Sequence, residues 1–228
     1  MANPSFQRAR SAENKRQRAS ALVEAARSLA LESGVASVTL TAVAERAGVH
    51  HSAVRRYFSS HKEVLLHLAE EGWTRWADAV SDELTGQAPA TPREVAEALA
   101  RGLDADPLFC DLLANVFLHL EHDVDAERVV SFKRGSRVAV ESMAEAIGNS
   151  VPGLDARGAL DIVTTAYALA ATLWQVAHPP EALARAYAED RTIAPLWALD
   201  FVPTLTRLLT AACIGISAEV AESAAGKR

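Results

Sequence analysis

Side chains that can bind phosphate are concentrated at the start of the chain. Residues 1–67 hold ten Lys and Arg against five Asp and Glu, whereas residues 68–228 hold 13 against 24. The formal charges of the two segments are therefore +5 and −11, within a net charge of −6. The first segment includes a basic run: Arg8, Arg10, Lys15, Arg16 and Arg18. This asymmetry suits a small DNA-binding domain on an acidic body, although a solvated basic tail would give the same count.

Other kinds of chemistry lack a complete set of residues. His119 and His122 are three residues apart and can share a helix face, but no further ligands are spaced to complete a metal shell, so a solvated helix end is the simpler interpretation. Cys110 and Cys213 lie in apolar helical patterns, as buried free thiols of a reducing compartment do. The sequence also has no Gly-rich phosphate loop, Ser-x-x-Lys motif or nucleophile elbow. We therefore expect no metal, no cofactor and no enzymatic activity.

The composition favours a globular protein of the cytoplasm. Half of the 228 residues are hydrophobic, which is enough for a large core. No stretch approaches the roughly 20 uninterrupted apolar residues of a membrane span, and the Arg-rich start does not resemble a secretory signal. The sequence therefore predicts no membrane partner.

Apolar residues recur at helical spacing along almost the whole chain, so the predicted fold is all-α. The segment from Thr85 to Pro92 interrupts the pattern as a linker. The predicted domains are 1–65, with residues 1–11 as a flexible basic arm, and 66–228. Helices are expected at about 12–32, 40–47, 51–58, 60–80, from 92, 107–120, 125–148, 155–178, 181–189 and 196–217.

The segment from Thr39 to Phe58 meets the geometric demands of a helix-turn-helix. Close approach of two short helices requires a small residue, which Ala44 supplies. The turn requires a residue that tolerates positive φ, which Gly48 supplies. The inner faces require branched apolar side chains, for which we expect Val43, Val49 and Val54. The sequence therefore predicts a helix-turn-helix at this position.

The same residues carry a family resemblance. Thr39-Leu-Thr-Ala-Val-Ala-Glu-Arg-Ala-Gly-Val49, Ala53-Val-Arg-Arg-Tyr-Phe58 and Ser60-His-Lys-Glu-Val-Leu65 resemble the TetR family of bacterial regulators. The resemblance covers about residues 12–70. It implies an all-helical homodimer with an N-terminal three-helix DNA-binding domain and a C-terminal ligand-binding and dimerisation domain. It also implies that the third helix contacts DNA and that a small molecule in the body releases it.

The resemblance assigns roles to individual positions. The third helix would lie in the major groove. Its base-reading candidates are His51, Ser52, Ala53 and Arg56. Arg56 is the first choice, since arginine is the commonest reader of guanine, although it could instead hold phosphate. His51 could equally remain exposed to solvent. The phosphate candidates are Thr39, Thr41, His50, Arg55, Tyr57, His61 and Lys62.

Three positions depart from the usual family pattern. His50 stands where Ser or Thr usually caps the third helix, Arg55 where a Tyr commonly meets phosphate, and His61 where a Lys commonly begins the fourth helix. Each substitute can still bind phosphate, but Arg55 could read bases instead. If His61 gains charge as the pH falls toward 6, DNA affinity should rise modestly.

The predicted helices 155–178 and 196–217 are apolar on two faces, so each must be buried on two sides. One face would cover the body's core and the other would pair with a second copy in a four-helix interface. One large monomeric core is the alternative, and either face of 155–178 could be the outer one. Interface candidates are Ile162, Ala166, Leu169, Leu173, Leu205, Leu208, Leu209 and Ala212. Effector-pocket candidates, for which core packing is the alternative, are Phe109, Leu113, Phe117, Tyr167 and Trp174.

The sequence thus predicts a homodimeric repressor that binds a palindromic operator in double-stranded DNA and is released by a small, largely apolar effector. An activator, or a regulator without an effector, fits the same residues.

Overall fold

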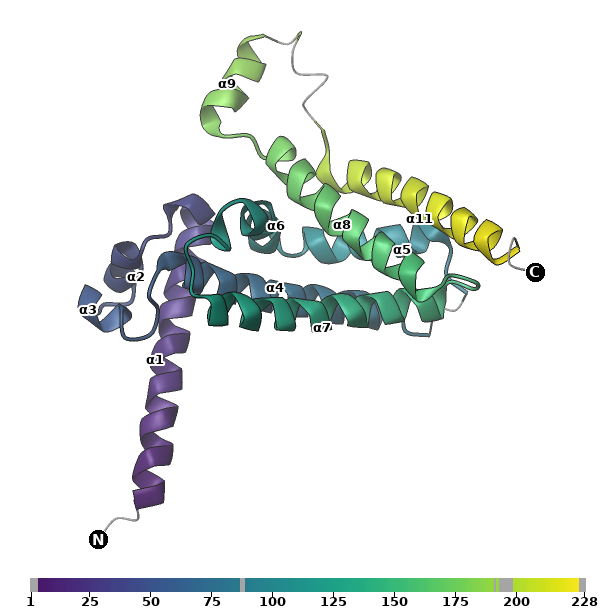
Figure 1. The fold of residues 1–228 in the computed structure, drawn as a ribbon. Helices are drawn as coiled ribbons and strands as arrows, with labels where there is room; N and C mark the ends of the chain where they lie inside the picture. Colours follow the sequence, from purple (N-terminus) through teal and green to yellow (C-terminus); the bar gives the residue numbers. More distant parts are fainter. Residues whose placement is uncertain (1–3, 87–88, 191, 193–198, 226–228) are drawn as a thin grey trace.

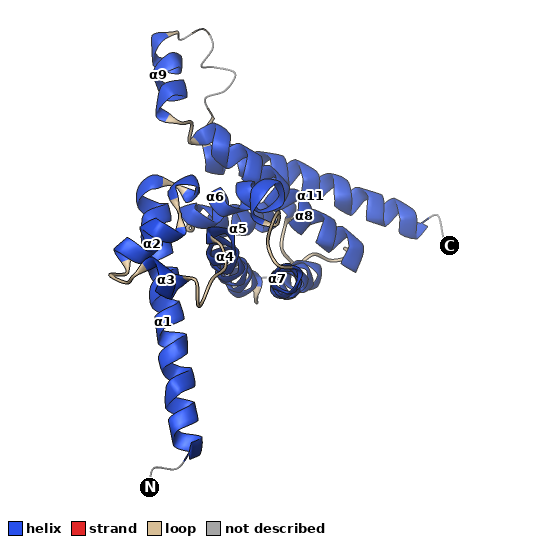
Figure 2. Ribbon diagram, turned by 60° about the vertical axis from the view of Figure 1, so that its left-hand side comes forward, coloured by secondary structure: helices blue, strands red, loops and turns tan. Residues whose placement is uncertain are grey.

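The computed structural model describes the backbone of residues 4–86, 89–190, 192 and 199–225, and their side chains from Glu13 onward except Ala224. Within these residues the fold is all-α and contains no strand, as predicted. Figure 1 shows the helices, and Figure 2 shows them from a second direction. The elements are α1 Pro4–Ser33, the 3₁₀ turn η1 Val35–Ser37, α2 Leu40–Arg46, α3 His51–Val54, α4 His61–Leu84, α5 Pro92–Asp104, α6 Pro107–Asn115, the π-helical turn η2 Val116–Leu120, α7 Ala126–Ser150, α8 Ala156–Ala177, α9 Glu181–Glu189 and α11 Phe201–Ala225.

The helices form a head and a body joined by α4. The head consists of α1, η1, α2 and α3, together with the start of α4 (Figure 1). In the body, α4 packs along α7, α8 packs on α6 and α7, and α11 packs on α5 and α8. The core runs through both parts without interruption and includes fully buried Leu65, Trp76 and Phe109. Because α4 contributes to both parts, any tilt of this helix changes how the head sits on the body.

Capping side chains fix several helix starts where the sequence predicts them. Thr39 Oγ1 accepts a hydrogen bond from the amide of Ala42 at 3.1 Å, which starts α2. Thr91 and Glu94 form a capping box at the start of α5, with Pro92 at its first turn. At α4, Ser60 accepts from the amide of Glu63, but the Glu63 carboxylate accepts from the amide of Ser59, one residue earlier than in a standard capping box.

Other boundaries differ from the expectation. The backbone is already helical from Pro4, so residues 4–11 are part of α1 rather than a flexible arm. No glycine or internal proline interrupts the chain between Ser5 and Ser33, which explains the continuous helix. The predicted helix 107–120 divides into α6 and the π-helical η2. The last helix begins at Phe201 and continues to Ala225, and residues 196–198 lie outside the described part.

Two body helices are apolar but poorly covered. By length and composition alone, Ala156–Ala177 and Phe201–Ser223 would be long enough to cross a membrane, although neither is an uninterrupted apolar stretch. Only 33% and 22%, respectively, of their most apolar 18-residue windows are buried in the protomer. Both helices therefore present apolar surface that the single chain does not cover.

Candidate nucleic-acid interface and its link to the body

The helix-turn-helix is built on a fully buried inner face. Val43, Ala44 and Val54 are 0–3% exposed, and Gly48 adopts φ 66° in the turn between α2 and α3, as predicted. The amide of Val49 donates to the carbonyl of Ala44 at 2.9 Å, which closes the turn. The expectation that Val49 packs inward was wrong, because Val49 is 40% exposed at the tight turn. The regular helix also ends at Val54 rather than near Phe58.

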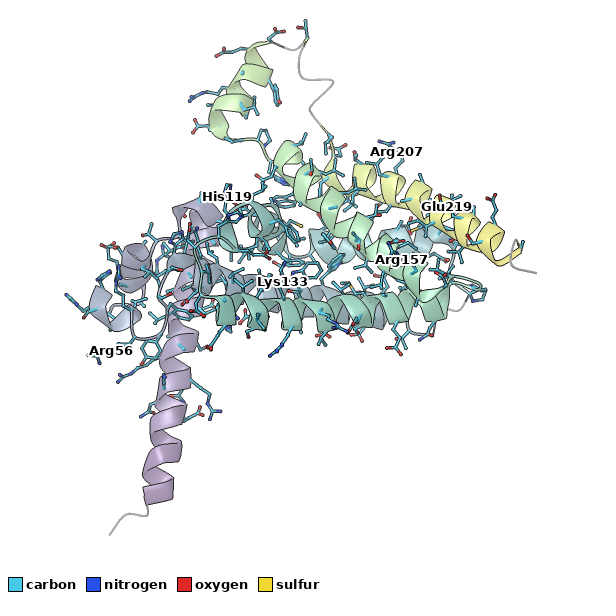
Figure 3. All side chains as sticks on the ribbon, in the orientation of Figure 1. Arg56, His119, Lys133, Arg157, Arg207 and Glu219 are labelled. Carbon is cyan, nitrogen blue, oxygen red and sulfur yellow. The ribbon has the colours of Figure 1, made fainter. Side chains whose placement is uncertain are left out.

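The base-reading candidates form the outer surface of this segment. His51, Ser52 and Arg56 are exposed, and Ala53 is half-buried. After Val54 the chain continues in tight turns, with the amide of Arg56 donating to Ala53 and that of Tyr57 to Val54. Arg56 therefore stays on the outer side although it lies beyond the helix, and Figure 3 shows its side chain beside α1.

Arg55 and His51 act as a pair in this structure. Arg55 Nε donates to His51 Nε2 at 3.2 Å, one helical turn away. The hydrogen bond brings a phosphate candidate and a base-reading candidate onto one patch, so either role for Arg55 would also position His51.

His50 caps α3 in place of the hydroxyl residue usual at this position. His50 Nδ1 accepts a hydrogen bond from the amide of Ser52 at 3.3 Å and lies 2.9 Å from Ser52 Oγ. An imidazole nitrogen can accept only when it carries no proton. The cap therefore requires the tautomer with Nδ1 unprotonated.

The other phosphate candidates border this surface. Thr39 and Thr41 are exposed at the start of α2, and Tyr57 is half-buried. His61 is half-buried at the start of α4, where burial and the neighbouring Lys62 charge hold the pKa of its imidazole below the ordinary value. His61 is thus neutral near pH 7 in the free protein.

Polar contacts join the head to the body at two points that local sequence signals do not reveal. Lys62 Nζ donates to the backbone carbonyl of His122 at 2.7 Å and lies 3.3 Å from Asp123 Oδ2, in the loop before α7. Asp111 on α6 accepts from the amide of Val35 in η1 at 3.0 Å, and from Gln175 Nε2 on α8 at 3.0 Å. Asp111 therefore bridges the head, α6 and α8.

A third contact, an ion pair, holds α1 against α4. Arg27 forms an ion pair with Glu71, and both side chains are partly shielded from solvent. Glu71 also lies near His67 and Arg75, and Arg75 pairs with Asp106 at the start of α6. The charges along α4 thus connect the head to α6.

The effector candidates do not all line one site. Phe109 and Leu113 are 0–1% exposed and pack as core. Phe109, Trp73, Tyr167 and Phe117 follow one another in a row with ring centroids 5.4–5.9 Å apart. The row ends at Phe117, which is 45% exposed in η2. Trp174 lies apart from this row, stacked on His178 at 3.7 Å and against Phe201 at 5.1 Å.

Half of the interface candidates belong to the protomer's own core. Ile162, Ala166, Leu205 and Leu209 are 0–1% exposed, which corrects the sequence-based assignment: a second chain cannot reach them. Leu169, Leu173, Leu208 and Ala212 remain partly exposed. The middle of the outward face of α8 instead presents the small side chains Thr164, Ala168 and Thr172, with exposed Arg157 and Gln175 toward its ends.

The fold and the exposed polar surface of its helix-turn-helix define the class of DNA-binding helical regulators. Residues 22–68 match the family described as bacterial regulatory proteins, tetR family, and residues 70–220 match the tetracyclin repressor-like C-terminal domain. The chain therefore belongs to the TetR family of DNA-binding transcriptional regulators.

Solved structures share the fold. The fatty acid degradation regulator FadR from Bacillus halodurans aligns over 88% of this chain and 94% of its own, with TM-score 0.52 and 17% identity. FadR from Bacillus subtilis, solved in complex with stearoyl-CoA, aligns over 85% and 96%, with TM-score 0.50 and 15% identity. A TetR/AcrR-family regulator from Thermobifida fusca aligns over 85% and 97%, with TM-score 0.51 and 19% identity. No curated protein matches the chain.

Proposed function

We propose that the chain is a homodimeric, cytoplasmic repressor that binds a palindromic operator and leaves it when a small, largely apolar effector enters the body. In this proposal it has no enzymatic role. The proposed DNA binding rests on one observation. In the short segment from His51 to Arg56, the side chains of His51, Ser52 and Arg56 are exposed while that of Val54 is fully buried. A rigid inner face holds the outer side chains at fixed positions, as major-groove recognition requires.

The dimer is supported by apolar surface that one chain leaves uncovered. On α11, Leu208 is half-exposed, Ala211 and Gly215 are exposed, and Ile214 is 55% exposed. Gly215 is particularly informative, because a glycine in a helix costs about 0.5–1 kcal/mol relative to alanine. Within the protomer nothing lies within 4 Å of a Cβ added at Gly215, and its φ is not positive, so the single chain does not require glycine there. A second chain crossing closely at this point would require it.

The substitution Gly215→Leu tests the dimer. Since the site is open in the protomer, the variant should fold with unchanged helicity, measured by far-ultraviolet circular dichroism, yet sediment as a monomer. Ala79→Leu, on an exposed position of α4, is the matched control and should leave the association state unchanged. A monomeric native protein, or a Gly215→Leu variant that still dimerises like the native chain, would contradict this interface.

The effector side rests on the aromatic row that ends at Phe117. A row of aromatic rings in edge-to-face and stacked contacts, which runs from the core to an exposed ring, offers apolar, polarisable contacts to a ligand. π-helical turns such as η2 also occur frequently at functional sites. We propose that the effector enters between η2 and α8 by displacing Phe117 from Tyr167. The stearoyl-CoA of the Bacillus subtilis FadR complex is a ligand with a long apolar chain, which suits this proposal.

A duplex selection followed by a release assay tests the whole proposal. The purified protein should enrich an inverted repeat from random duplexes. Stearoyl-CoA and stearic acid should release that duplex, whereas coenzyme A without an acyl chain should not. Transcription from a promoter overlapping the repeat should fall when the protein is added and recover with the effector. Enrichment of a sequence without inverted-repeat symmetry would refute the palindromic operator. Activation of transcription instead of inhibition would refute the repressor role.

A further inference from the structure

The first half of α1 extends beyond the part of the head that packs. Among the described side chains of α1, which begin at Glu13, Leu22 is the first that is buried, and none from Glu13 to Ala21 is buried. The 18 residues from Pro4 to Ala21, here called the N-terminal arm, are about 27 Å long at the helical rise of about 1.5 Å per residue. Figures 1 and 2 both show this half of α1 projecting away from the other helices. The match to the family's DNA-binding region begins only at residue 22, after the arm.

The arm carries positive charge that the described protein does not neutralise. Its only acidic residue is Glu13, against five Lys and Arg. Glu13 accepts hydrogen bonds from Arg16 at 2.7 Å and Gln17 at 3.3 Å. Lys15 and Arg18 are exposed, and among the described residues neither has an ion-pair partner. A solvated helix gains nothing in stability from such clustered charge, whereas a polyanion would be attracted to it.

Lys15 and Arg18, the cations without an ion-pair partner among the described side chains of the arm, lie on the side of the DNA-reading segment. Arg18 lines a hollow of about 270 Å³ between α1 and the helix-turn-helix, together with Ala53, Arg56 and Tyr57. Lys15 lines a second hollow of about 640 Å³, which shares Arg56 and Tyr57 with the first. The charged face of the arm is therefore continuous with the surface that includes Arg56. A DNA duplex bound to that surface would extend along the arm.

From this continuity we propose that the N-terminal arm is a second DNA-binding element, in which Lys15 and Arg18 bind backbone phosphates flanking the operator half-site. Its length of about 27 Å corresponds to about eight base pairs at ~3.4 Å per pair, enough to reach beyond the contacts of the reading segment. Phosphate contacts of this kind add affinity without sequence preference. The placement rests on the proposed role of the helix-turn-helix, but the charge effect does not depend on which bases are read.

The test uses the full-length protein and its double variant Lys15→Gln/Arg18→Gln. Binding is measured by fluorescence anisotropy over a range of salt concentrations, on the selected operator with flanks of ten base pairs, on the same operator without flanks, and on a scrambled duplex of the longer length. Arg93→Gln/Arg134→Gln is the control, because it removes the same charge from exposed positions on α5 and α7. All four substituted side chains are exposed, so both variants should fold normally.

The native protein should bind the flanked operator more tightly than the unflanked one, and the double variant should lose most of that gain. On flanked DNA the variant's affinity should fall by at least roughly tenfold at moderate salt, and its log–log salt slope should flatten by about four units per dimer, because two phosphate contacts are lost in each protomer. The control should behave like the native protein.

The outcomes separate the two proposals. If the native protein does not prefer the operator to the scrambled duplex, the proposed function fails, but the arm still predicts weaker and less salt-dependent binding of the scrambled duplex by the double variant. If the double variant matches the native protein on both long duplexes, or if flanks add nothing to native binding, the arm does not bind DNA.

Discussion

Lys62 Nζ donates a hydrogen bond to the backbone carbonyl of His122 at 2.7 Å, so a head residue proposed to hold phosphate is engaged by the body in the free protein. The nearby Asp123 carboxylate reinforces the contact at 3.3 Å. Phosphate and the loop before α7 would thus compete for one ammonium group. Movement of this loop offers a direct way for the body to change the affinity of the head for DNA.

Removing the competing carboxylate should strengthen DNA binding. Asp123 adopts φ 58°, which asparagine tolerates, so Asp123→Asn should preserve the loop. Because the Asp123 carboxylate is exposed, the ion pair is worth about 0.2–1 kcal/mol, and operator affinity should rise about 1.5- to 5-fold. The matched control is Glu127→Gln, which removes the same charge four residues away. Equal gains for the two variants would show a general charge effect and not the release of Lys62.

Arg56→Ala should relax specificity at one base pair of each half-site. A bidentate arginine contact to guanine discriminates by about 1–3 kcal/mol, so the variant should lose most of its preference at that pair while other positions keep theirs. Repeating the duplex selection with the variant measures this directly. Lys62→Ala is the comparison, since loss of a proposed phosphate contact should weaken binding to all sequences alike. An equal loss on operator and random DNA for Arg56→Ala would refute base reading.

DNA binding should depend on pH through His61. Its folded pKa lies below the ordinary value of about 6.5, so protonation favours the unfolded chain and the free protein loses a little stability as the pH falls below 6.5. Phosphate favours the charged form, so operator affinity should rise over the same range. His61→Gln should flatten that rise in anisotropy measurements between pH 8 and pH 5.5. Identical profiles for the variant and the native protein would exclude His61.

Replacing two helical glycines by alanine should change the stability of the protein in opposite directions. A Cβ at Gly72 would overlap the ring of Phe109, with Cγ only 2.6 Å away, so Gly72→Ala should cost about 1–3 kcal/mol of unfolding free energy despite the better helix propensity. At Gly148 the nearest neighbour would be 3.9 Å away, and alanine should add about 0.5–1 kcal/mol. Denaturant titrations measure both. A stable Gly72→Ala variant would mean that α4 and α6 pack less closely than described.

Neither thiol should react in the native state. Burial raises the pKa of Cys213 to about 11, and burial together with nearby Asp106 raises that of Cys110 further above the ordinary range. An aromatic disulfide reagent at pH 8 should therefore detect both thiols only after denaturation. Fast labelling of native protein would reveal local opening of the core.

Local signals in the sequence predict much of this fold. The helices capped by Thr39 and Thr91 begin where the sequence predicts, and Gly48 forms the turn of the helix-turn-helix, because each feature depends only on residues a few positions away. Periodicity also predicts that α8 is apolar on two faces, but it does not say which face a single chain buries. The assignment of Ile162 and Ala166 to the outside was wrong for that reason. The π-helical η2 has no local signature at all.

The long-range contacts of the candidate site could not be predicted from the sequence. The DNA-facing residues come from one continuous segment and could be selected by resemblance, and their roles remain predictions. The ties Lys62–His122 and Asp111–Val35 join residues 60 and 76 positions apart, which no periodicity or motif brings together. Val49 illustrates the opposite case, since an apolar residue at the expected spacing is exposed by the geometry of a tight turn.

The 24 residues of α4 make it about 36 Å long at ~1.5 Å per residue, with the Ser60 cap at the head and Leu84 at the far side of the body. If α4 moves as a rigid rod of that length, a small change in its angle displaces its far end by a large distance. A tilt of roughly five degrees about Leu84 would carry Ser60 sideways by about 3 Å, close to the ~3.4 Å that separates neighbouring base pairs. A rearrangement too small to disturb the packing of the body can therefore put its two heads out of step with the double helix.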